Sequence, residues 1–206
     1  MGLPYDIVRI QKYNPKWAED YEKEREEISA ILNNSSFEIR HIGSTSIPEM
    51  PAKPIIDIMV GVNTNEDFQE CIESLEKVGY DYFGECGRPG RIFFVKGEPG
   101  NCTNHLHLVV KDSNYWVNNI LLAEYFKKNE QAARKYAEKK IELAVQYRED
   151  RHMYRIFKSE YISKVLDEVS SDVAIDTYQL GKEWKNDVGD ISFSRKCKCP
   201  NINAEM

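Results

Sequence analysis

Apolar residues recur along this chain in two periods, and the change between them predicts where helices and strands lie. A spacing of three or four residues is typical of one face of a helix, and alternation is typical of a half-buried strand. A helix is expected from Asn14-Pro15, a favourable first turn, to Asn33. A second is expected from Thr64, with Asp67 in its cap, to Gly79 at its carboxyl end.

Alternating segments bounded by turn residues predict the strands. They are residues 37–42, 55–62, 80–83, 91–96 and 105–110. The segment 98–104 is expected to be a polar turn. The order of helix, two strands, helix and three strands predicts a mixed sheet with helices packed against it, an α+β or α/β fold.

The carboxyl-terminal part of the chain has helical periodicity only, and three helices are expected from Ser113 onward. The sequence therefore predicts one domain over residues 1–170, with a sheet core at about 33–112 and a helical part at about 113–170. Periodicity fades beyond this point. Residues 171–206 are expected to form an extension that is loosely docked or disordered.

Composition narrows the class of protein. With 206 residues, 41% apolar and 30% charged, the chain is typical of a soluble globular domain. It has neither a run of about 18 apolar residues nor a secretory signal, so no membrane span and a cytoplasmic location are expected.

Five cysteines without a framework spacing favour reduced thiols, and Cys197-Lys198-Cys199 is interpreted as part of a mobile tail rather than a metal site. The net charge of −6 argues against a nucleic-acid partner but allows a small nucleotide; oligomeric state is not indicated.

A polar turn, Gly43-Ser44-Thr45-Ser46, directly follows the strand at 37–42. Glycine permits close backbone approach, and consecutive N–H groups with hydroxyls can hold phosphate oxygens. The spacing matches neither a P-loop nor a dinucleotide fingerprint. The sequence therefore leaves two interpretations open: a phosphate-binding turn or an ordinary polar turn.

A single carboxylate, Asp57, interrupts the apolar strand at 55–62. Because side chains alternate along a strand, it shares its face with Met59. A charge there is costly unless it is paired, bound to metal or exposed. Asp57 is expected to be a metal ligand or a general base; the alternative is an ion pair with Arg40 or Lys53.

His105 and His107 lie two residues apart on one expected strand, so both project from the same face. Two imidazoles in this arrangement can converge on one metal ion or one substrate phosphate. The alternative is that both are hydrogen-bonded residues of the sheet.

Basic side chains are candidate phosphate contacts, and Lys53 is the best placed because it lies between two prolines in the loop that leads to Asp57. For Lys140 and Lys158, which interrupt helical apolar stripes, the alternative is a solvated helix face. The remaining candidates are Arg40, Arg88 and Arg91.

The segment HIGSTSIPEMPAKPIIDIMVGV resembles the signature of the GrpB family of uncharacterised proteins. The resemblance continues through Asn14-Pro15-Lys16-Trp17, the strand His105-Leu106-His107-Leu108-Val109 and the helix at 154–162 with Lys158, and it covers roughly residues 8–169. The GrpB family is similar in fold to the nucleotidyltransferase superfamily, which implies a mixed β-sheet core flanked by helices and a C-terminal helical part.

In that superfamily a Gly-Ser turn holds a triphosphate, and carboxylates of the following strands bind divalent metal. The resemblance implies that Gly43 and Ser44 match the Gly-Ser pair and that Asp57 matches the first carboxylate. The second carboxylate position is Met59, a poor Mg²⁺ ligand. The strand expected to supply the third offers His105 and His107, which suit zinc, manganese or iron better than magnesium.

Three functions follow, in order of preference. The first is a nucleotidyltransferase-like enzyme that moves a nucleotidyl group from a nucleoside triphosphate to a small molecule or a protein, with Asp57 and Ser44 as catalytic residues. Phosphate would contact the turn at 43–46 and the lysines named above, and a divalent cation (Mg, Mn or Zn) would bind Asp57, His105 and His107. The second is a non-catalytic module that binds a nucleotide or a phosphorylated metabolite, and the third is a metal-dependent hydrolase.

Overall fold

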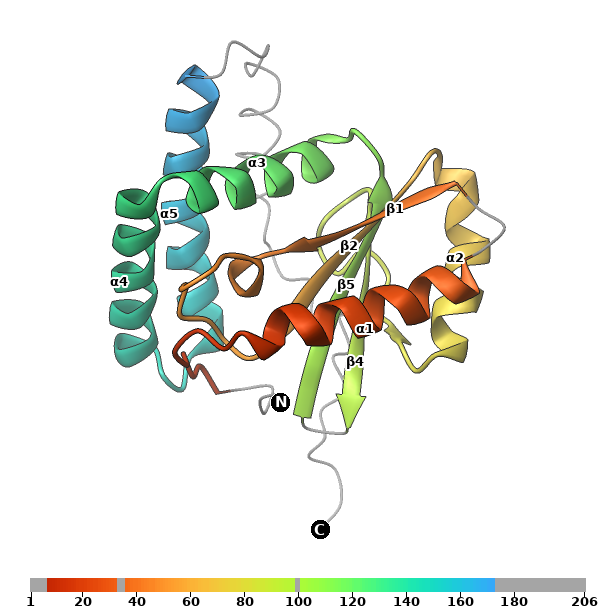
Figure 1. The fold of residues 1–206 in the computed structure, drawn as a ribbon, viewed down its shortest axis with the longest axis horizontal. Coiled ribbons are helices and arrows are strands. Elements are labelled where there is room, and N and C mark those ends of the chain that lie inside the picture. The colour runs from red at the N-terminus through yellow and green to blue at the C-terminus, as the bar shows by residue number, and fades with distance from the viewer. Residues whose placement is uncertain (1–6, 33–35, 99–100, 173–206) are drawn as a thin grey trace.

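A five-stranded mixed β-sheet forms the centre of the protein, as seen in a computed structural model that describes residues 7–32, 36–98 and 101–172 (Figure 1). The strands run in the order β1-β2-β5-β4-β3. They are β1 (Phe37–Ile42), β2 (Ile56–Val62), β3 (Asp81–Tyr82), β4 (Arg91–Glu98) and β5 (Asn101–Val110). The central strands β2 and β5 are parallel, and the other neighbouring pairs are antiparallel.

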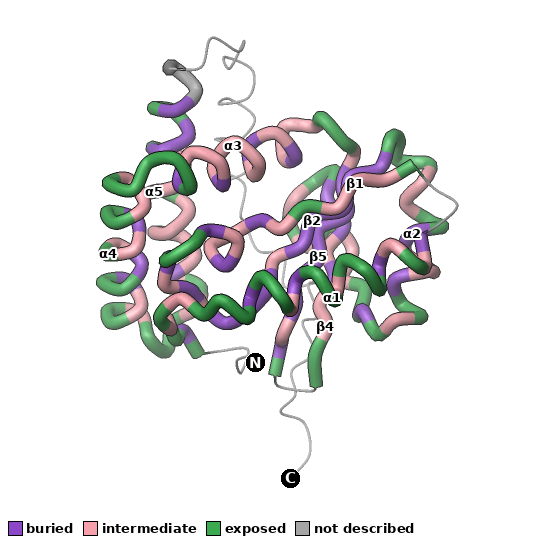
Figure 2. The backbone as a smooth tube through the Cα atoms, viewed as in Figure 1, coloured by how far each residue is buried: buried purple, intermediate pink, exposed green. Residues whose placement is uncertain are grey.

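Two helices, α1 (Lys16–Ile31) and α2 (Phe68–Lys77), pack against one face of the sheet. Alternate residues of the central strands point to this face, which gives the buried middle of the molecule in Figure 2. Each large apolar side chain buried here contributes about 1.5–3 kcal/mol. The fully buried members of this layer include Ile28, Ile56, Ile58, Val60, Leu75, Phe94, Leu106 and Leu108.

The opposite face is closed at one end by helix α3 (Asn114–Lys128). Trp116 of this helix packs with Met59 and Val109. Its ring lies so close to Gly61 that a Cβ at this position would overlap it. The absence of a side chain at Gly61 therefore allows the helix to sit directly on the sheet.

Helices α4 (Glu130–Gln146) and α5 (Arg151–Asp172) pack against each other and against α3, and so form the helical part of the molecule (Figure 1). Ile47 and Met50, in the loop between β1 and β2, pack into the apolar cluster of these helices. This contact joins the loop after the Gly-Ser turn to the helical part.

The predicted fold, a mixed β-sheet core flanked by helices with a helical part after it, is confirmed. The expected caps are present as well. The side chain of Asp67 accepts a hydrogen bond from the backbone N–H of Thr64 at 2.9 Å, in a capping box around a short 3-10 turn (Asn65–Asp67). Gly79 follows α2 with φ +84°, the left-handed conformation that glycine adopts readily.

The predicted polar turn at 98–104 is wrong, because β5 already begins at Asn101 and pairs there with Glu98. The polar residues of this segment form the outer end of a two-stranded ribbon, where backbone hydrogen bonds rather than apolar contacts define the strand. Thr103 also donates its hydroxyl to the carbonyl of Lys96 at 3.0 Å. The strand expected at 80–83 is limited to Asp81–Tyr82.

The extension predicted for residues 171–206 lies outside the described residues from 173 onward, as does Cys197-Lys198-Cys199. Helix α5 continues to Asp172. None of the helices in the described ranges has the length and apolar content that a membrane crossing requires.

The contact between Gly61 and Trp116 gives a direct test of how α3 is seated. Gly61→Ala should lower the free energy of unfolding by about 1–3 kcal/mol, because the new methyl group overlaps a buried ring. Urea unfolding measures the change. Val145→Ala on α4 is the control, since Val145 is 78% exposed and its truncation should cost little. A Gly61→Ala protein as stable as the parent would contradict the packing described.

Candidate active site

The Gly-Ser turn lies directly against Asp57. Ile42, the last residue of β1, is the sheet partner of Asp57, so the turn that follows β1 begins beside this carboxylate. A Cβ added to Gly43 would lie 2.5 Å from the Oδ2 atom of Asp57. Gly43 has φ +70° and ψ −171°, a region that is essentially restricted to glycine. The backbone of the turn and the carboxylate thus meet at one point.

The hydroxyls of the turn are held by the protein itself. Thr45 is buried; its hydroxyl lies 3.0 Å from Nε2 of His41 and donates to the carbonyl of Ile55. The hydroxyl of Ser46 donates to the carbonyl of Gly43 at 2.7 Å. These two contacts stabilise the shape of the turn, which here forms a short 3-10 helix (Ser44–Ser46).

Ser44 lies near Tyr136 of helix α4: burial raises the pKa of the Tyr136 phenol to about 12, and Ser44 opposes this effect. Tyr136 is buried and stacks on Phe126 and Tyr161, with ring centroids 4.8 and 5.7 Å away. The aromatic stack of the helical part therefore lies near Ser44.

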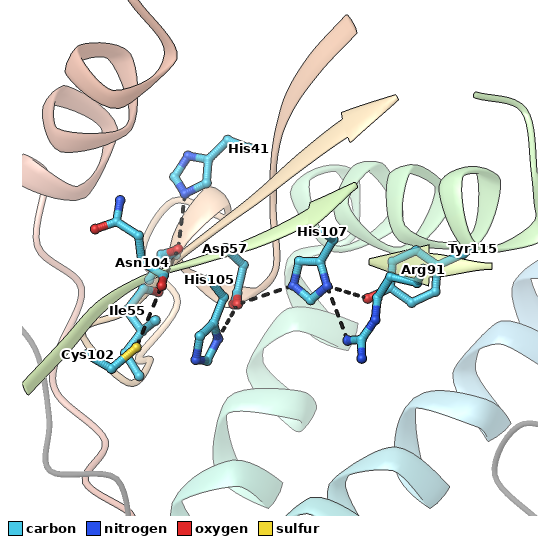
Figure 3. Close-up of polar contacts among 10 residues, drawn as sticks. His41, Ile55, Asp57, Arg91, Cys102, Asn104, His105, His107 and Tyr115 are labelled. Carbon is cyan, nitrogen blue, oxygen red and sulfur yellow. Dashed lines mark hydrogen bonds and ion pairs between the residues drawn. The ribbon is translucent and has the colours of Figure 1, made fainter. Parts of the chain in front are cut away.

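Asp57, His105 and His107 converge across the parallel pair β2–β5 (Figure 3). His105 is the sheet partner of Asp57, and its Nδ1 lies 3.0 Å from the Oδ1 atom of Asp57. The Nε2 atom of His107 lies 3.9 Å from the same oxygen. The side chain of Asp57 is 30% exposed, against 14% for His105 and 10% for His107. The carboxylate is thus the most accessible of the three.

The second nitrogen of His107 has its own partners. Nδ1 lies 2.9 Å from the hydroxyl of Tyr115 and 3.4 Å from the guanidinium of Arg91 (Figure 3). A guanidinium can only donate, so Nδ1 accepts and the ring proton sits on Nε2, facing Asp57. Sequence reasoning missed Tyr115, since the helix spacing gives no sign that its hydroxyl meets a sheet histidine.

Burial acts in opposite directions on the acid and the imidazoles. Burial by itself would raise the pKa of Asp57, but the hydrogen bond from His105 and the nearby imidazole of His107 outweigh it and hold this pKa well below its ordinary value. Burial lowers the pKa of His105 and lowers that of His107 to about 4, despite the opposing effect of Asp57. At neutral pH the site therefore holds one carboxylate and two neutral imidazoles.

Basic side chains surround this single carboxylate. Burial, together with the charges of Arg151 and Lys158, lowers the pKa of Lys53 to about 7. Burial also lowers the pKa of Lys158, and Arg155 adds to the effect while Asp57 opposes it. Neither lysine forms an ion pair with the residues that the structure describes. Both lysines also lie within electrostatic range of Asp57.

The predicted alternative of a solvated face is wrong for Lys140, which is 2% exposed. Its ammonium donates to the carbonyl of Pro51 and lies 4.5 Å from the centroid of the Tyr136 ring. Lys140 thus ties helix α4 to the loop between β1 and β2. Its predicted phosphate contact remains a prediction.

The sequence analysis did not single out Arg151 and Arg155. The signal was present, because positions 151, 155 and 158 follow the i, i+4, i+7 spacing of one face of α5.

The ion pair considered between Asp57 and Arg40 is wrong: Arg40 pairs with Glu38 on the exposed side of β1, and Asp57 interacts with the histidines.

As arranged, the side chains do not fit a metal ion. Met59, where the family resemblance implies a second carboxylate, is fully buried, and the two imidazoles direct N–H groups rather than lone pairs toward Asp57. Across the described ranges, no three His, Cys, Asp or Glu side chains are placed to hold a metal ion. Ligation by His107 would require it to change tautomer against Arg91.

Fold and site together define a mixed α/β protein in which a Gly-Ser turn and a strand carboxylate share one basic site. The model of the family described as GrpB protein matches residues 7–168, and the chain belongs to this family. The resemblance found in the sequence is confirmed.

Several relatives are similar over most of this chain. The UPF0157 protein YqkA of Bacillus subtilis is 36% identical over 160 residues, which cover 77% of this chain and 46% of YqkA; the chain spans less than half of that relative. The glutamate-rich protein GrpB of Alkalihalophilus pseudofirmus is 28% identical, over 82% of this chain and 99% of its own. The crystal structure of conserved protein GrpB from Enterococcus faecalis has a TM-score of 0.73 and 31% identity, over 80% of this chain and 98% of that one.

The structural neighbours also include the Cid1 poly(U) polymerase, in a structure described as MgGTP bound. Identity is 14% and the TM-score is 0.48, over 66% of this chain and 44% of the polymerase. At this TM-score the likeness is too weak to indicate a function.

The contact between Gly43 and Asp57 can be tested with a matched pair of substitutions. Gly43→Ala should lower the free energy of unfolding by more than Gly87→Ala, because both residues have positive φ but only the first methyl group meets a side chain. Strain at positive φ costs each variant roughly 1–3 kcal/mol, and the ψ of −171° at Gly43 puts its cost toward the upper end. The overlap with Asp57 should add about 1–3 kcal/mol to Gly43→Ala alone. Equal losses in urea unfolding would show that the turn does not lie against Asp57.

Stability should fall on acidification. Burial lowers the pKa of His41 and of His107 from the ordinary 6.5 to about 4, so the unfolded chain binds more protons between these values. The contribution of these two neutral imidazoles to the free energy of unfolding is fully present above pH 6.5. It is lost as pH falls to about 4, and the free energy of unfolding changes by about 1.4 kcal/mol per pH unit for each proton. His41→Asn should reduce the slope by about one proton. Urea unfolding across this range checks it; an unchanged slope would contradict the burial of His41.

Proposed function

We propose that this protein is a nucleotidyltransferase-like enzyme that moves a nucleotidyl group from a nucleoside triphosphate onto a small molecule or a protein. The observation that carries the proposal is the contact between the backbone of Gly43 and the carboxylate of Asp57. It places a turn suited to phosphate beside an ionised acid.

The electrostatics favour a polyanionic ligand. Lys53 and Lys158 lie within electrostatic range of Asp57, and the charge of Lys158 disfavours the charged form of Lys53. Two unit charges 4 Å apart interact by about 4 kcal/mol where the effective dielectric constant is about 20. A bound triphosphate would reverse that repulsion, which makes this class of ligand the best match for the site.

Each residue has a separate part in the proposal. The backbone of Gly43 and Ser44 approaches the phosphates, and Lys53 with Lys158 offsets the charge of the pyrophosphate that leaves. The carboxylate of Asp57 lies beside this turn and accepts a hydrogen bond from His105. No step is assigned to a metal ion, because the donor set does not fit one.

The second candidate is a module that binds a nucleotide or phosphorylated metabolite without turning it over. The observation that favours it is Met59, which occupies a carboxylate position and is buried between Trp116 and Val109. Both candidates predict ligand binding, and only the first predicts a transferred nucleotidyl group. Mass spectrometry of the products distinguishes them. The metal-dependent hydrolase is less well supported, because the side chains of the site do not fit a metal ion.

Triphosphate binding should be accompanied by proton uptake. Because the pKa of Lys53 is about 7 in the free protein, most of this side chain is neutral at about pH 8. A bound phosphate favours its charged form, so calorimetry in two buffers of different ionisation enthalpy should show uptake approaching one proton. Lys53→Met should abolish that uptake. Binding without any uptake would place the phosphates away from Lys53.

Lys158→Met should weaken triphosphate binding about tenfold to a hundredfold, the value of one charge-assisted hydrogen bond. Lys164→Met is the matched control, since Lys164 lies on the same helix and is exposed. Equal affinities for the two variants, or no binding of any nucleoside triphosphate to the parent protein, would refute the proposed site.

A further inference from the structure

The geometry points to His105 as the proton acceptor of the reaction, oriented by Asp57, in place of the metal ligation that the family resemblance implies for these side chains. The substrate in this inference rests on the proposed function. The arrangement of the two residues does not.

The two nitrogens of His105 have different surroundings. Nδ1 lies 3.0 Å from a carboxylate oxygen, which can only accept, so Nδ1 carries the ring proton. Nε2 then keeps a lone pair. None of the described residues forms a hydrogen bond to Nε2, and the ring extends away from Asp57 (Figure 3). An acid that fixes the tautomer of an imidazole, so that its far nitrogen can take a proton, is a recurring arrangement for general-base catalysis.

The surroundings of His107 differ from those of His105. Both nitrogens of His107 have neighbours, since Nε2 faces Asp57 and Nδ1 accepts from Tyr115 and Arg91. His107 therefore has no lone pair to offer a substrate. Phe93 packs against both rings, with centroids 5.1 and 5.3 Å away, and limits how far either can turn. Of the two histidines on this face, only His105 presents a lone pair.

Asp57 touches both His105 and Gly43, so the lone pair of His105 and the phosphate-binding turn flank one carboxylate. A nucleotide seated on the turn would present its α-phosphorus near this point. An acceptor hydroxyl that approaches it would come within reach of Nε2.

The acceptor oxygen forms a bond to the α-phosphorus as its proton moves to Nε2 of His105, and the bond from phosphorus to the bridging oxygen breaks to release pyrophosphate. The imidazolium that forms lies beside the negative charge of Asp57, which stabilises it. Asp57 is thus a positioning residue in this scheme, and His105 is the catalytic one.

The tautomer of His105 is the test that does not depend on turnover. Long-range ¹H–¹⁵N spectra of the full chain labelled at histidine should show His105 with its proton on Nδ1. Asp57→Asn should shift it toward the Nε2–H form, because the amide accepts less strongly. A proton on Nε2 in the parent protein would overturn the inference. So would a stoichiometric shift of the His105 and His107 signals together on addition of Zn²⁺ or Mg²⁺ alone.

Turnover supplies the second arm. His105→Asn should reduce kcat by at least about a hundredfold and leave the calorimetric affinity for the nucleoside triphosphate unchanged. His152→Asn, an exposed position on α5, is the control and should alter neither. If the His105→Asn protein keeps its rate, the proton-accepting role is wrong while the transferase proposal stands. If the parent binds no triphosphate, the transferase proposal is wrong, and the tautomer alone decides the inference.

Discussion

The site depends on one close approach, that of the Gly43 backbone to the carboxylate of Asp57. Antiparallel pairing of β1 with β2 sets it up, because Ile42 and Asp57 are partners and the chain must turn immediately beyond them. Only a residue without a side chain, and with access to this φ and ψ, can continue there. The hydrogen bond from Ser46 to Gly43 and the contacts of Thr45 then hold the turn in place. A local backbone requirement thus brings together a polar turn and an acid that lie on different strands.

The face that carries Asp57 has two ends with opposite character. At one end Trp116 seals Met59 and Gly61 beneath helix α3, and this closure provides the apolar packing that a strand interior requires. At the other end Asp57 keeps part of its surface accessible and faces the basic side of α5. The carboxylate is stable there because two histidines contact it and cations lie nearby. Lys53 and Lys158, which form no ion pair with the described residues, are the physical reason for proposing a phosphate ligand.

Much of this could be predicted from the sequence, and the failures have identifiable causes. Period-two alternation placed Asp57 on the face opposite Ile56 and Ile58, and put His105 and His107 on one face together. It could not indicate that β2 and β5 are parallel neighbours in the register that brings His105 opposite Asp57. Long-range pairing of that kind leaves no local pattern. The burial of Lys140 was missed for the same reason, since it joins a helix to a distant loop. The hydrogen bond of Tyr115 to His107 joins α3 to the strand just before it, and it depends on how the helix packs on the sheet, which the helical spacing does not show.

The central claim is that the turn at residues 43–46 and Asp57 form one site for a nucleoside triphosphate. A crystal structure of the protein with a non-hydrolysable triphosphate analogue tests it most directly. In that structure the phosphate oxygens should lie against the backbone of Gly43 and Ser44, with Lys53 in contact and the α-phosphate beside Asp57. An analogue bound elsewhere on the molecule, or phosphates directed away from this turn, would contradict it.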